Sequence, residues 1–166
     1  MRKQYDVAVI GAGAQGRSHL AAMMEVRDIQ KVTVYDQRRE AAKKYQKEME
    51  EKYKVPVMVC DSVEEAVKGA EIICTVTPSK EPYLKAEWIA PGAHINAVGA
   101  FTPNTREIES RLMAKAKLYA DQVEAMKKEC GEYLIPKDEG LFGEEHITGS
   151  IGGILAGKVP GRENDT

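Results

Sequence analysis

The stretch Tyr5-Asp6-Val7-Ala8-Val9-Ile10-Gly11-Ala12-Gly13-Ala14-Gln15-Gly16 is followed by a helical segment and then by Lys31-Val32-Thr33-Val34-Tyr35-Asp36. It combines an apolar run, the pattern G-x-G-x-x-G, a helix and a second apolar run that ends in an acidic residue twenty positions after the third glycine. This order is typical of a dinucleotide-binding βαβ unit. A glycine-rich turn without a ligand is the alternative, because the glycine pattern alone is common in turns.

The three glycines of this pattern have different expected roles. Gly11 allows the tight turn after the strand, Gly13 lets a pyrophosphate approach the backbone, and Gly16 lets the helix pack close to the strand. The first N–H groups of the helix have no helical acceptor, and the positive end of the helix dipole attracts phosphate. We therefore expect the backbone of Ala14 and Gln15 to bind a pyrophosphate, while the Gln15 side chain is either a further contact or solvated.

The residues after the second apolar run bear on which dinucleotide binds. Asp36 is expected to accept hydrogen bonds from the adenosine ribose hydroxyls and to repel a 2′-phosphate, which favours NAD(H). Arg38 and Arg39 keep NADP(H) possible, because arginines at this place can pair with that phosphate. Gln37 and Arg38 are included among the expected cofactor contacts.

Composition argues against several classes of function. The 166 residues are 43% hydrophobic and 30% charged, and the formal net charge of −2 argues against a nucleic-acid or membrane-surface binder. No apolar run approaches the roughly 20 residues of a membrane span, and no signal peptide is predicted. Cys60, Cys74 and Cys130 lack metal-ligand spacing. We therefore expect no metal site and a cytoplasmic protein.

Strand and helix patterns alternate along the chain. This predicts an α/β fold with a doubly wound parallel sheet of about six strands in the order 3-2-1-4-5-6, the NAD(P)-binding Rossmann fold. We expect one dinucleotide-binding domain over residues 1–160 and a frayed tail over residues 161–166. The predicted strands are Tyr5–Ile10, Lys31–Tyr35, Pro56–Cys60, Glu71–Thr77, His94–Val98 and Lys117–Ala120. The predicted helices lie at about 14–26, 38–52, 62–69, 83–89, 106–116 (with Asn104 and Glu107 in cap positions) and 147–155 (interrupted by glycines). A further helix is predicted after the sixth strand, capped by Asp121-Gln122-Val123-Glu124.

In such a sheet, ligands bind beyond the carboxyl ends of the strands, where strands 1 and 4 diverge. Besides the glycine turn, this rule nominates the segments Thr75–Ser79 and Asn96–Thr102. Thr77 either places its hydroxyl near a ribose or, together with Pro78, only ends the strand. Small residues after the fifth strand leave room for a nicotinamide. The expected cofactor contacts in these loops are Thr75, Val76, Thr77, Pro78, Asn96, Ala97, Val98 and Gly99.

Several blocks taken together resemble the ornithine cyclodeaminase/mu-crystallin family. They are GAGAQGRSHL at 11–20, TVTPS at 75–79, PGAHINAVGA at 91–100, Gly131-Glu132, and GKVPGR at 157–162. The resemblance covers nearly the whole chain. It implies hydride transfer between a nicotinamide and the α-carbon of a small amino or imino acid, and it assigns residues 96–99 to the cofactor.

Subunits of that family are much longer than this chain. Their second domain holds the substrate carboxylate and forms a homodimer interface. The resemblance therefore implies that this chain is an excised nucleotide-binding domain or a short gene product. We expect it to be inactive alone and the longer protein to be homodimeric.

Phe101 limits the chemistry that the resemblance implies. Cyclodeaminases of the family carry an acidic residue at this position, and a phenyl ring cannot transfer a proton. Ornithine cyclization is therefore in doubt, whereas ketimine-reductase-like and alanine-dehydrogenase-like reactions remain. The sequence identifies no catalytic residue. The alternative function is a non-catalytic protein of the mu-crystallin type that binds a nucleotide and a small ligand.

Overall fold

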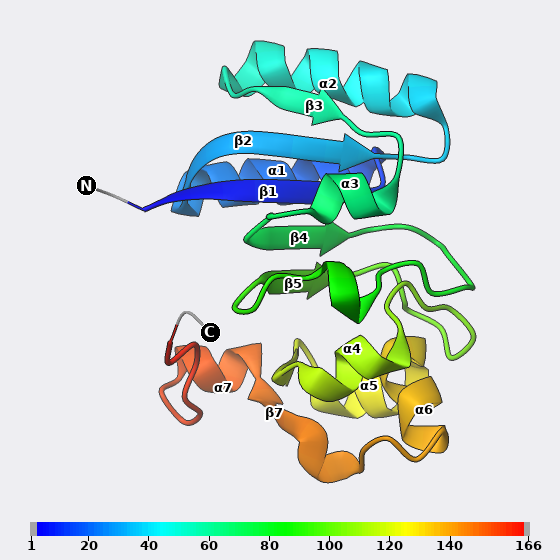
Figure 1. Cartoon of the computed structure of the whole chain (residues 1–166). Helices are drawn as coiled ribbons and strands as arrows, with labels where there is room; N and C mark the ends of the chain where they lie inside the picture. Colours follow the sequence, from blue (N-terminus) through cyan, green and yellow to red (C-terminus); the bar gives the residue numbers. More distant parts are fainter. Residues whose placement is uncertain (1–2, 165–166) are drawn as a thin grey trace. The chain divides into compact units, whose positions relative to one another are not determined.

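The apolar runs of the sequence form a five-stranded parallel sheet (Figure 1). The computed structural model describes residues 3–164, and the strands lie in the order β3-β2-β1-β4-β5. Each strand is parallel to its neighbours. The predicted fold class and the order of the first five strands are confirmed. The strands are β1 (Gln4–Ile10), β2 (Asp28–Tyr35), β3 (Val57–Val59), β4 (Ile72–Thr75) and β5 (His94–Ala97).

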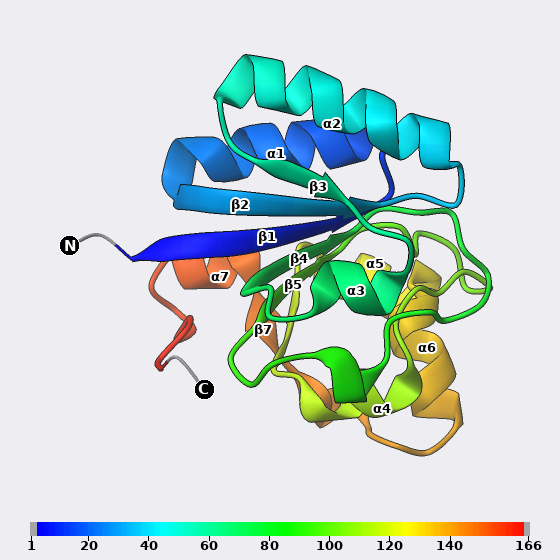
Figure 2. The ribbon, with the colours of Figure 1, turned by 45° about the horizontal axis from the view of Figure 1, so that its top comes forward.

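Helices cover both faces of this sheet (Figure 2). Helices α1 (Ala14–Val26) and α2 (Arg39–Tyr53) lie on one face, and α3 (Val63–Val67) lies on the other. The central strands therefore bury side chains on both faces, and Val7 and Ile73 are at most 1% exposed. Each such aliphatic side chain contributes about 1.5–3 kcal/mol to stability by leaving water. This burial fixes the strand ends, and with them the loops that follow.

The described chain forms two compact units. The first contains the residues up to Thr77 together with Glu87–Val98, and it therefore holds the whole five-stranded sheet. The second contains Pro78–Ala86 and the residues from Gly99 onward. Short 3-10 helices occur at Ala86–Trp88 and Glu144–His146, and the helices of the second unit are α4 (Ser110–Lys115), α5 (Val123–Glu129), α6 (Gly131–Asp138) and α7 (Ile151–Leu155).

The sixth predicted strand does not join the main sheet. Strand β6 (Leu118–Ala120) forms where it was expected, but it pairs in parallel with β7 (Ile147–Ser150) in a separate two-stranded sheet. The segment 147–155 was expected to be one interrupted helix, and it is instead a strand followed by α7. Val159 packs closely against this strand at Gly149, where a Cβ would lie 2.7 Å from a methyl carbon of Val159.

The helix predicted from Arg106 begins only at Ser110. Its N-cap residue is Glu109, with an extended ψ of 148°, so the expectation that Asn104 and Glu107 cap the helix is wrong.

Buried carboxyl groups hold the segment before this helix in its extended form. Glu107 accepts hydrogen bonds from the Tyr83 hydroxyl at 2.6 Å and from the Gly99 amide at 2.9 Å. Glu132, on α6, accepts hydrogen bonds from the backbone amides of Glu107 and Ile108. Both glutamates are at most 2% exposed. Because buried polar groups must be paired, these tertiary hydrogen bonds override the local helix pattern.

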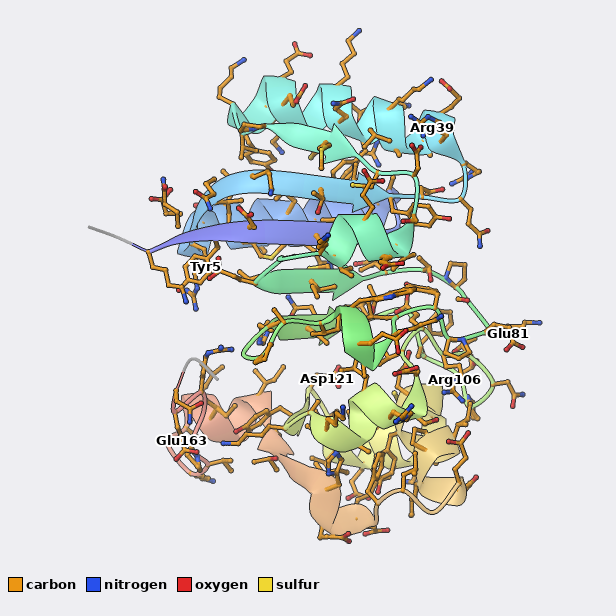
Figure 3. All side chains as sticks on the ribbon, in the orientation of Figure 1. Tyr5, Arg39, Glu81, Arg106, Asp121 and Glu163 are labelled. Carbon is orange, nitrogen blue, oxygen red and sulfur yellow. The ribbon has the colours of Figure 1, made fainter. Side chains whose placement is uncertain are left out.

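The end of the described chain contacts β6 and the residue before it. The Tyr119 hydroxyl donates a hydrogen bond to the Pro160 carbonyl at 3.0 Å. Lys117 pairs at 3.2 Å with Glu163, which is labelled near the end of the described chain in Figure 3. Residues 165 and 166 of the tail predicted to fray lie outside the described residues. Within residues 3–164, no helix has the length and apolar character that crossing a bilayer requires.

The burial of Glu132 predicts a pH dependence of stability. Burial raises the pKa of Glu132 to about 7, although its hydrogen bonds from backbone amides oppose the shift. Between about pH 4.5 and 7 the folded chain then binds more protons than the unfolded chain, so the free energy of unfolding falls as the pH rises through this window. The loss is about 3 kcal/mol.

Glu132→Gln should flatten this slope in urea unfolding measured from pH 5 to 8. The exposed-site control Glu124→Gln should keep it, and equal slopes in wild type and Glu132→Gln would contradict the assignment.

Candidate nucleotide-binding site

The glycine turn joins β1 to α1, and packing requires two of its three glycines. Gly11 has a φ of +112°, which side chains rarely allow, and a Cβ there would lie 2.8 Å from the Val76 carbonyl oxygen. A Cβ on Gly16 would overlap the carbonyl oxygen of Gly11. The helix therefore packs against the turn with no room for a methyl group at Gly16, as the sequence predicts.

Gly13 is different, because nothing in the protein itself requires a glycine there. Its backbone is extended, with a φ of −83°, and a Cβ would meet no atom within 4 Å. A side chain at Gly13 would occupy the open space in front of the turn. This is the space that a pyrophosphate needs if it is to approach the backbone.

The first turn of α1 is suited to bind an anion. Gly13 is its N-cap and supplies no side-chain acceptor, and the first turn contains no acidic residue. The first N–H groups of any α-helix lack a helical acceptor. Ala14 and Gln15, like Gly13, are exposed. The turn therefore presents unpaired N–H groups at the positive end of the helix dipole.

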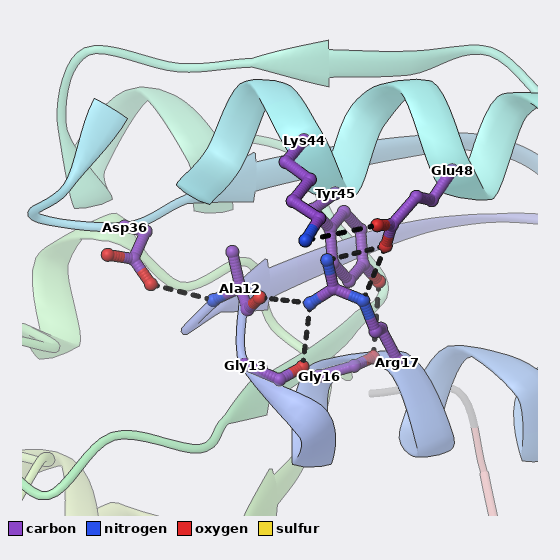
Figure 4. A network of polar contacts seen from close by, with 8 residues as sticks. All are labelled: Ala12, Gly13, Gly16, Arg17, Asp36, Lys44, Tyr45 and Glu48. Atoms are coloured by element: carbon purple, nitrogen blue, oxygen red, sulfur yellow. Dashed lines mark hydrogen bonds and ion pairs between the residues drawn. The ribbon is translucent and has the colours of Figure 1, made fainter. Parts of the chain in front are cut away.

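Asp36 connects the end of β2 to this turn (Figure 4). Its carboxylate accepts hydrogen bonds from the amide of Ala12 at 2.9 Å and from the amide of Arg38 at 2.8 Å. The side chain is only 13% exposed. An acidic group is thereby held beside the glycine turn, at the place where an adenosine ribose is expected.

The two arginines after Asp36 have different partners. The Arg38 side chain is 80% exposed, and its Nε lies 3.7 Å from an Asp36 oxygen. Arg39, labelled at the start of α2 in Figure 3, forms an ion pair with Asp61, which follows β3. Gln37 is exposed. The negative charge of Asp36 therefore faces the turn, while the nearest arginines pair with carboxylates.

The loops after β4 and β5 adjoin the glycine turn and each other. The Val76 amide donates a hydrogen bond to the Ile10 carbonyl at 3.0 Å, and the Val98 amide donates one to the Thr75 carbonyl at 2.9 Å. Thr77 lies close to Gly11, where a Cβ would lie 3.2 Å from its methyl carbon. The carboxyl ends of β4 and β5 thus bring residues 75–77 and 96–98 to the same edge of the sheet as the glycine turn.

Exposure separates the predicted contacts of these two loops. Ala97 and Val98 are open to solvent, and Val76 and Thr77 are half-buried. Thr75 is fully buried, and its hydroxyl has no hydrogen-bond partner among the described residues.

Three other predicted cofactor contacts remain. Asn96 bonds to neighbouring residues of the sheet, and Pro78 and Gly99 belong to the second unit. The Asn96 side chain bonds to Cys74 at 3.6 Å and to His94 at 3.0 Å, and so lies against the sheet. Pro78 and Gly99 begin the stretches of the second unit. The cofactor contacts of all these residues stay predictions.

Three residues, Arg17, Tyr45 and Glu107, make contacts that sequence patterns could not reveal. Arg17 and Tyr45 contact the glycine turn through its carbonyl groups. Glu107 holds the amide of Gly99 at 2.9 Å. Phe101 is 68% exposed. In the described residues, no three His, Cys, Asp or Glu side chains are grouped as they would be to hold a metal ion.

Comparison with known proteins identifies the family to which this chain is similar. The sequence profile of the ornithine cyclodeaminase/mu-crystallin family matches residues 2–166. The chain is 40% identical over 154 residues to the ketimine reductase mu-crystallin of Mus musculus, which covers 93% of this chain and 46% of the relative. The chain thus spans about half the length of the curated relatives that it matches.

Solved structures show the same fold. The Delta(1)-pyrroline-2-carboxylate reductase of Thermococcus litoralis, in complex with NADH and L-proline, is 38% identical with a TM-score of 0.96 over 99% of this chain and 51% of that one. An archaeal alanine dehydrogenase dimer with bound NAD is 37% identical with a TM-score of 0.91, over 97% of this chain and 49% of that one.

The packing at the turn predicts unequal losses of stability for two glycine substitutions. Gly16→Ala should lower the free energy of unfolding by about 2 kcal/mol or more, because the methyl group has no room beside Gly11. Gly13→Val should lower it by less than about 1 kcal/mol, the ordinary cost of losing a glycine at an N-cap. Urea unfolding of both variants measures the difference. Equal losses would show that packing does not distinguish the two positions.

Proposed function

This chain belongs to the ornithine cyclodeaminase/mu-crystallin family, and we propose that it is the NAD(H)-binding half of an oxidoreductase acting on small amino or imino acids. The observation that carries the proposal is the open space at Gly13, in front of a helix N-terminus without a side-chain cap. Two relatives more than 35% identical to this chain have NADH or NAD bound in their structures. The full reaction is hydride transfer at the α-carbon of the substrate.

The chain's own residues divide the work of holding such a cofactor. The N–H groups at the start of α1, from Ala14 and Gln15, bind the pyrophosphate. Asp36 accepts hydrogen bonds from the adenosine ribose, and Ala97 and Val98 leave room for the nicotinamide after β5. When bound, the nicotinamide supplies or takes the hydride, and the protein's role is to orient it and exclude water.

The surroundings of Asp36 support NAD(H) over NADP(H). Its carboxylate is fixed by two backbone N–H groups and would repel a 2′-phosphate. Arg39 is already paired with Asp61, so Arg38 is the arginine with the more exposed side chain near that position. NADP(H) binding then requires a rearrangement that NAD(H) binding does not.

The proposed substrate class is a cyclic imino acid such as Delta(1)-pyrroline-2-carboxylate. The relatives named above include a reductase of this compound with L-proline bound. The longer protein would hold the substrate with residues outside this chain and, like the archaeal alanine dehydrogenase, form a dimer. All three cysteines are free thiols, which suits a reducing compartment, and the cytoplasm is the proposed location.

A second candidate is a protein that binds the nucleotide and a small ligand without catalysis. Phe101, exposed and unable to transfer a proton, favours it. The two candidates separate in one assay of the longer protein, which is NADH oxidation with Delta(1)-pyrroline-2-carboxylate. Turnover supports the reductase. Tight NADH binding without turnover on cyclic imino acids or on pyruvate with ammonia supports the binding protein.

Gly13→Val tests cofactor binding directly. A valine side chain would fill the space in front of the turn, so NADH affinity measured by isothermal titration calorimetry should fall by about a hundredfold or more while the fold is retained. Gly152→Val is the matched control, because a Cβ at Gly152 also meets no atom within 4 Å. This control should bind NADH as wild type does. Failure of wild type to bind NADH or NADPH at millimolar concentration would overturn the proposed function.

Asp36→Ser tests the preference between the two dinucleotides. Removing the carboxylate should weaken NADH and strengthen NADPH, each by about tenfold, because the repulsion of the 2′-phosphate disappears and Arg38 becomes able to pair with it. Asp28→Ser, at the amino end of β2 and therefore at the other end of the strand that Asp36 follows, should change neither affinity. A wild-type protein that prefers NADPH would show that Asp36 does not decide the preference.

A further inference from the structure

Arg17 makes an unusual set of contacts with the glycine turn (Figure 4). Its Nη1 donates hydrogen bonds to the carbonyl oxygen of Ala12 and, at 3.1 Å, to the carbonyl oxygen of Gly13. The side chain is 28% exposed. A single guanidinium therefore holds two consecutive carbonyl groups of the turn where the cofactor is proposed to bind.

The guanidinium is itself fixed by α2. Its Nε and Nη2 lie 2.7 and 2.6 Å from one carboxylate oxygen of Glu48, and its central carbon lies 5.4 Å from the centre of the Tyr45 ring. Tyr45 is completely buried, and its hydroxyl donates a hydrogen bond to the Gly16 carbonyl at 3.1 Å. Lys44 lies 3.8 Å from the other oxygen of Glu48, and within residues 3–164 it forms no hydrogen bond or ion pair with the turn. Arg17 is thus held in one position.

The carbonyl contacts determine where the N–H groups point. In a trans peptide the C=O of one residue and the N–H of the next point in opposite directions. Holding the Ala12 carbonyl therefore directs the Gly13 amide away from Arg17, and holding the Gly13 carbonyl directs the Ala14 amide away in the same manner. The Ala12 amide is already bound to Asp36 at 2.9 Å. Asp36 and Arg17 together fix three consecutive peptide groups.

We propose that Arg17 is a positioning residue for the dinucleotide pyrophosphate, because it orients the amides of Gly13 and Ala14 before any ligand arrives. This inference rests on the proposed function for its ligand, but the orientation of the amides is a property of the protein alone. The competing role is structural: Arg17 could simply join α1 to α2 through Glu48. The two roles differ in which measurement changes when Arg17 is replaced.

The first experiment needs no ligand. Backbone ¹⁵N relaxation gives the order parameters of Gly13 and Ala14 in wild type and in Arg17→Met, which keeps the aliphatic stem and loses the hydrogen bonds. We expect values near 0.85 at both amides in wild type and a fall below about 0.6 at Gly13 in the variant, because the Ala12 carbonyl loses its hydrogen bond from Arg17 and the peptide between Ala12 and Gly13 becomes free to rotate. Ala14 should change less, because the Gly13 carbonyl still accepts a hydrogen bond from the backbone amide of residue 17 at 3.3 Å. Lys44→Met, which removes a like charge from the same network, should leave both values unchanged. Unchanged order parameters in Arg17→Met would overturn the inference.

The second experiment compares ligand fragments by calorimetry. Arg17→Met should weaken ADP-ribose, which contains the pyrophosphate, by about tenfold and adenosine by less than about twofold. Glu48→Gln, which loosens the anchor of Arg17 and keeps the arginine, should give an intermediate loss for ADP-ribose only. Equal losses for both fragments, or the same loss in Lys44→Met, would assign Arg17 a structural or purely electrostatic role. Failure of wild type to bind ADP-ribose would contradict the proposed function, and the relaxation experiment would still decide the role of Arg17 in the turn.

Discussion

The first turn of α1 packs against the loop leaving β1 so closely that Gly16 has no room for a methyl group, and the rest of the site depends on this contact. The contact places the start of the helix at the carboxyl edge of the sheet. It lets Tyr45 reach the Gly16 carbonyl from α2, and it brings Arg17 within reach of two carbonyl groups of the turn. Each of these bonds depends on a helix held against the strand. A side chain at Gly16 would move the helix and with it all of the N–H groups that are proposed to bind phosphate.

In the proposed function, the site recognises an anion with neutral groups. The chain carries a formal charge of −2, and the first turn of α1 contains no basic residue before Arg17. The cation that lies close to the turn, Arg17, is paired with Glu48. Attraction of a pyrophosphate then comes from oriented backbone N–H groups and the helix dipole, which require no reorganisation on binding if the peptides are already fixed. Asp36 adds a negative charge beside the same turn. This charge favours hydrogen bonds from ribose hydroxyls and repels a further phosphate.

The sequence predicts the first five strands and the glycine turn well because each depends on local patterns. Strands buried on both faces appear as uninterrupted apolar runs, and α1 begins at Ala14 as the glycine pattern indicates. The failures have tertiary causes. Glu107 looked like a helix cap and is a buried acceptor for Tyr83 and Gly99, and β6 pairs with a glycine-containing strand that resembled a helix. The role of Arg17 could not be predicted either, since its partners are carbonyl oxygens, which no residue pattern identifies. Which carbonyl groups a side chain reaches depends on the tertiary fold.

The central claim is that the backbone N–H groups at the start of α1 bind the pyrophosphate of NAD(H). Titration of the ¹⁵N-labelled chain with NADH, followed by two-dimensional NMR, tests it most directly because each amide reports separately. The account predicts that the largest chemical-shift changes occur at the amides of Gly13, Ala14 and Gln15, and that they saturate together. Saturable NADH binding that leaves these three amides unchanged, with the shifts concentrated elsewhere in the chain, would contradict it.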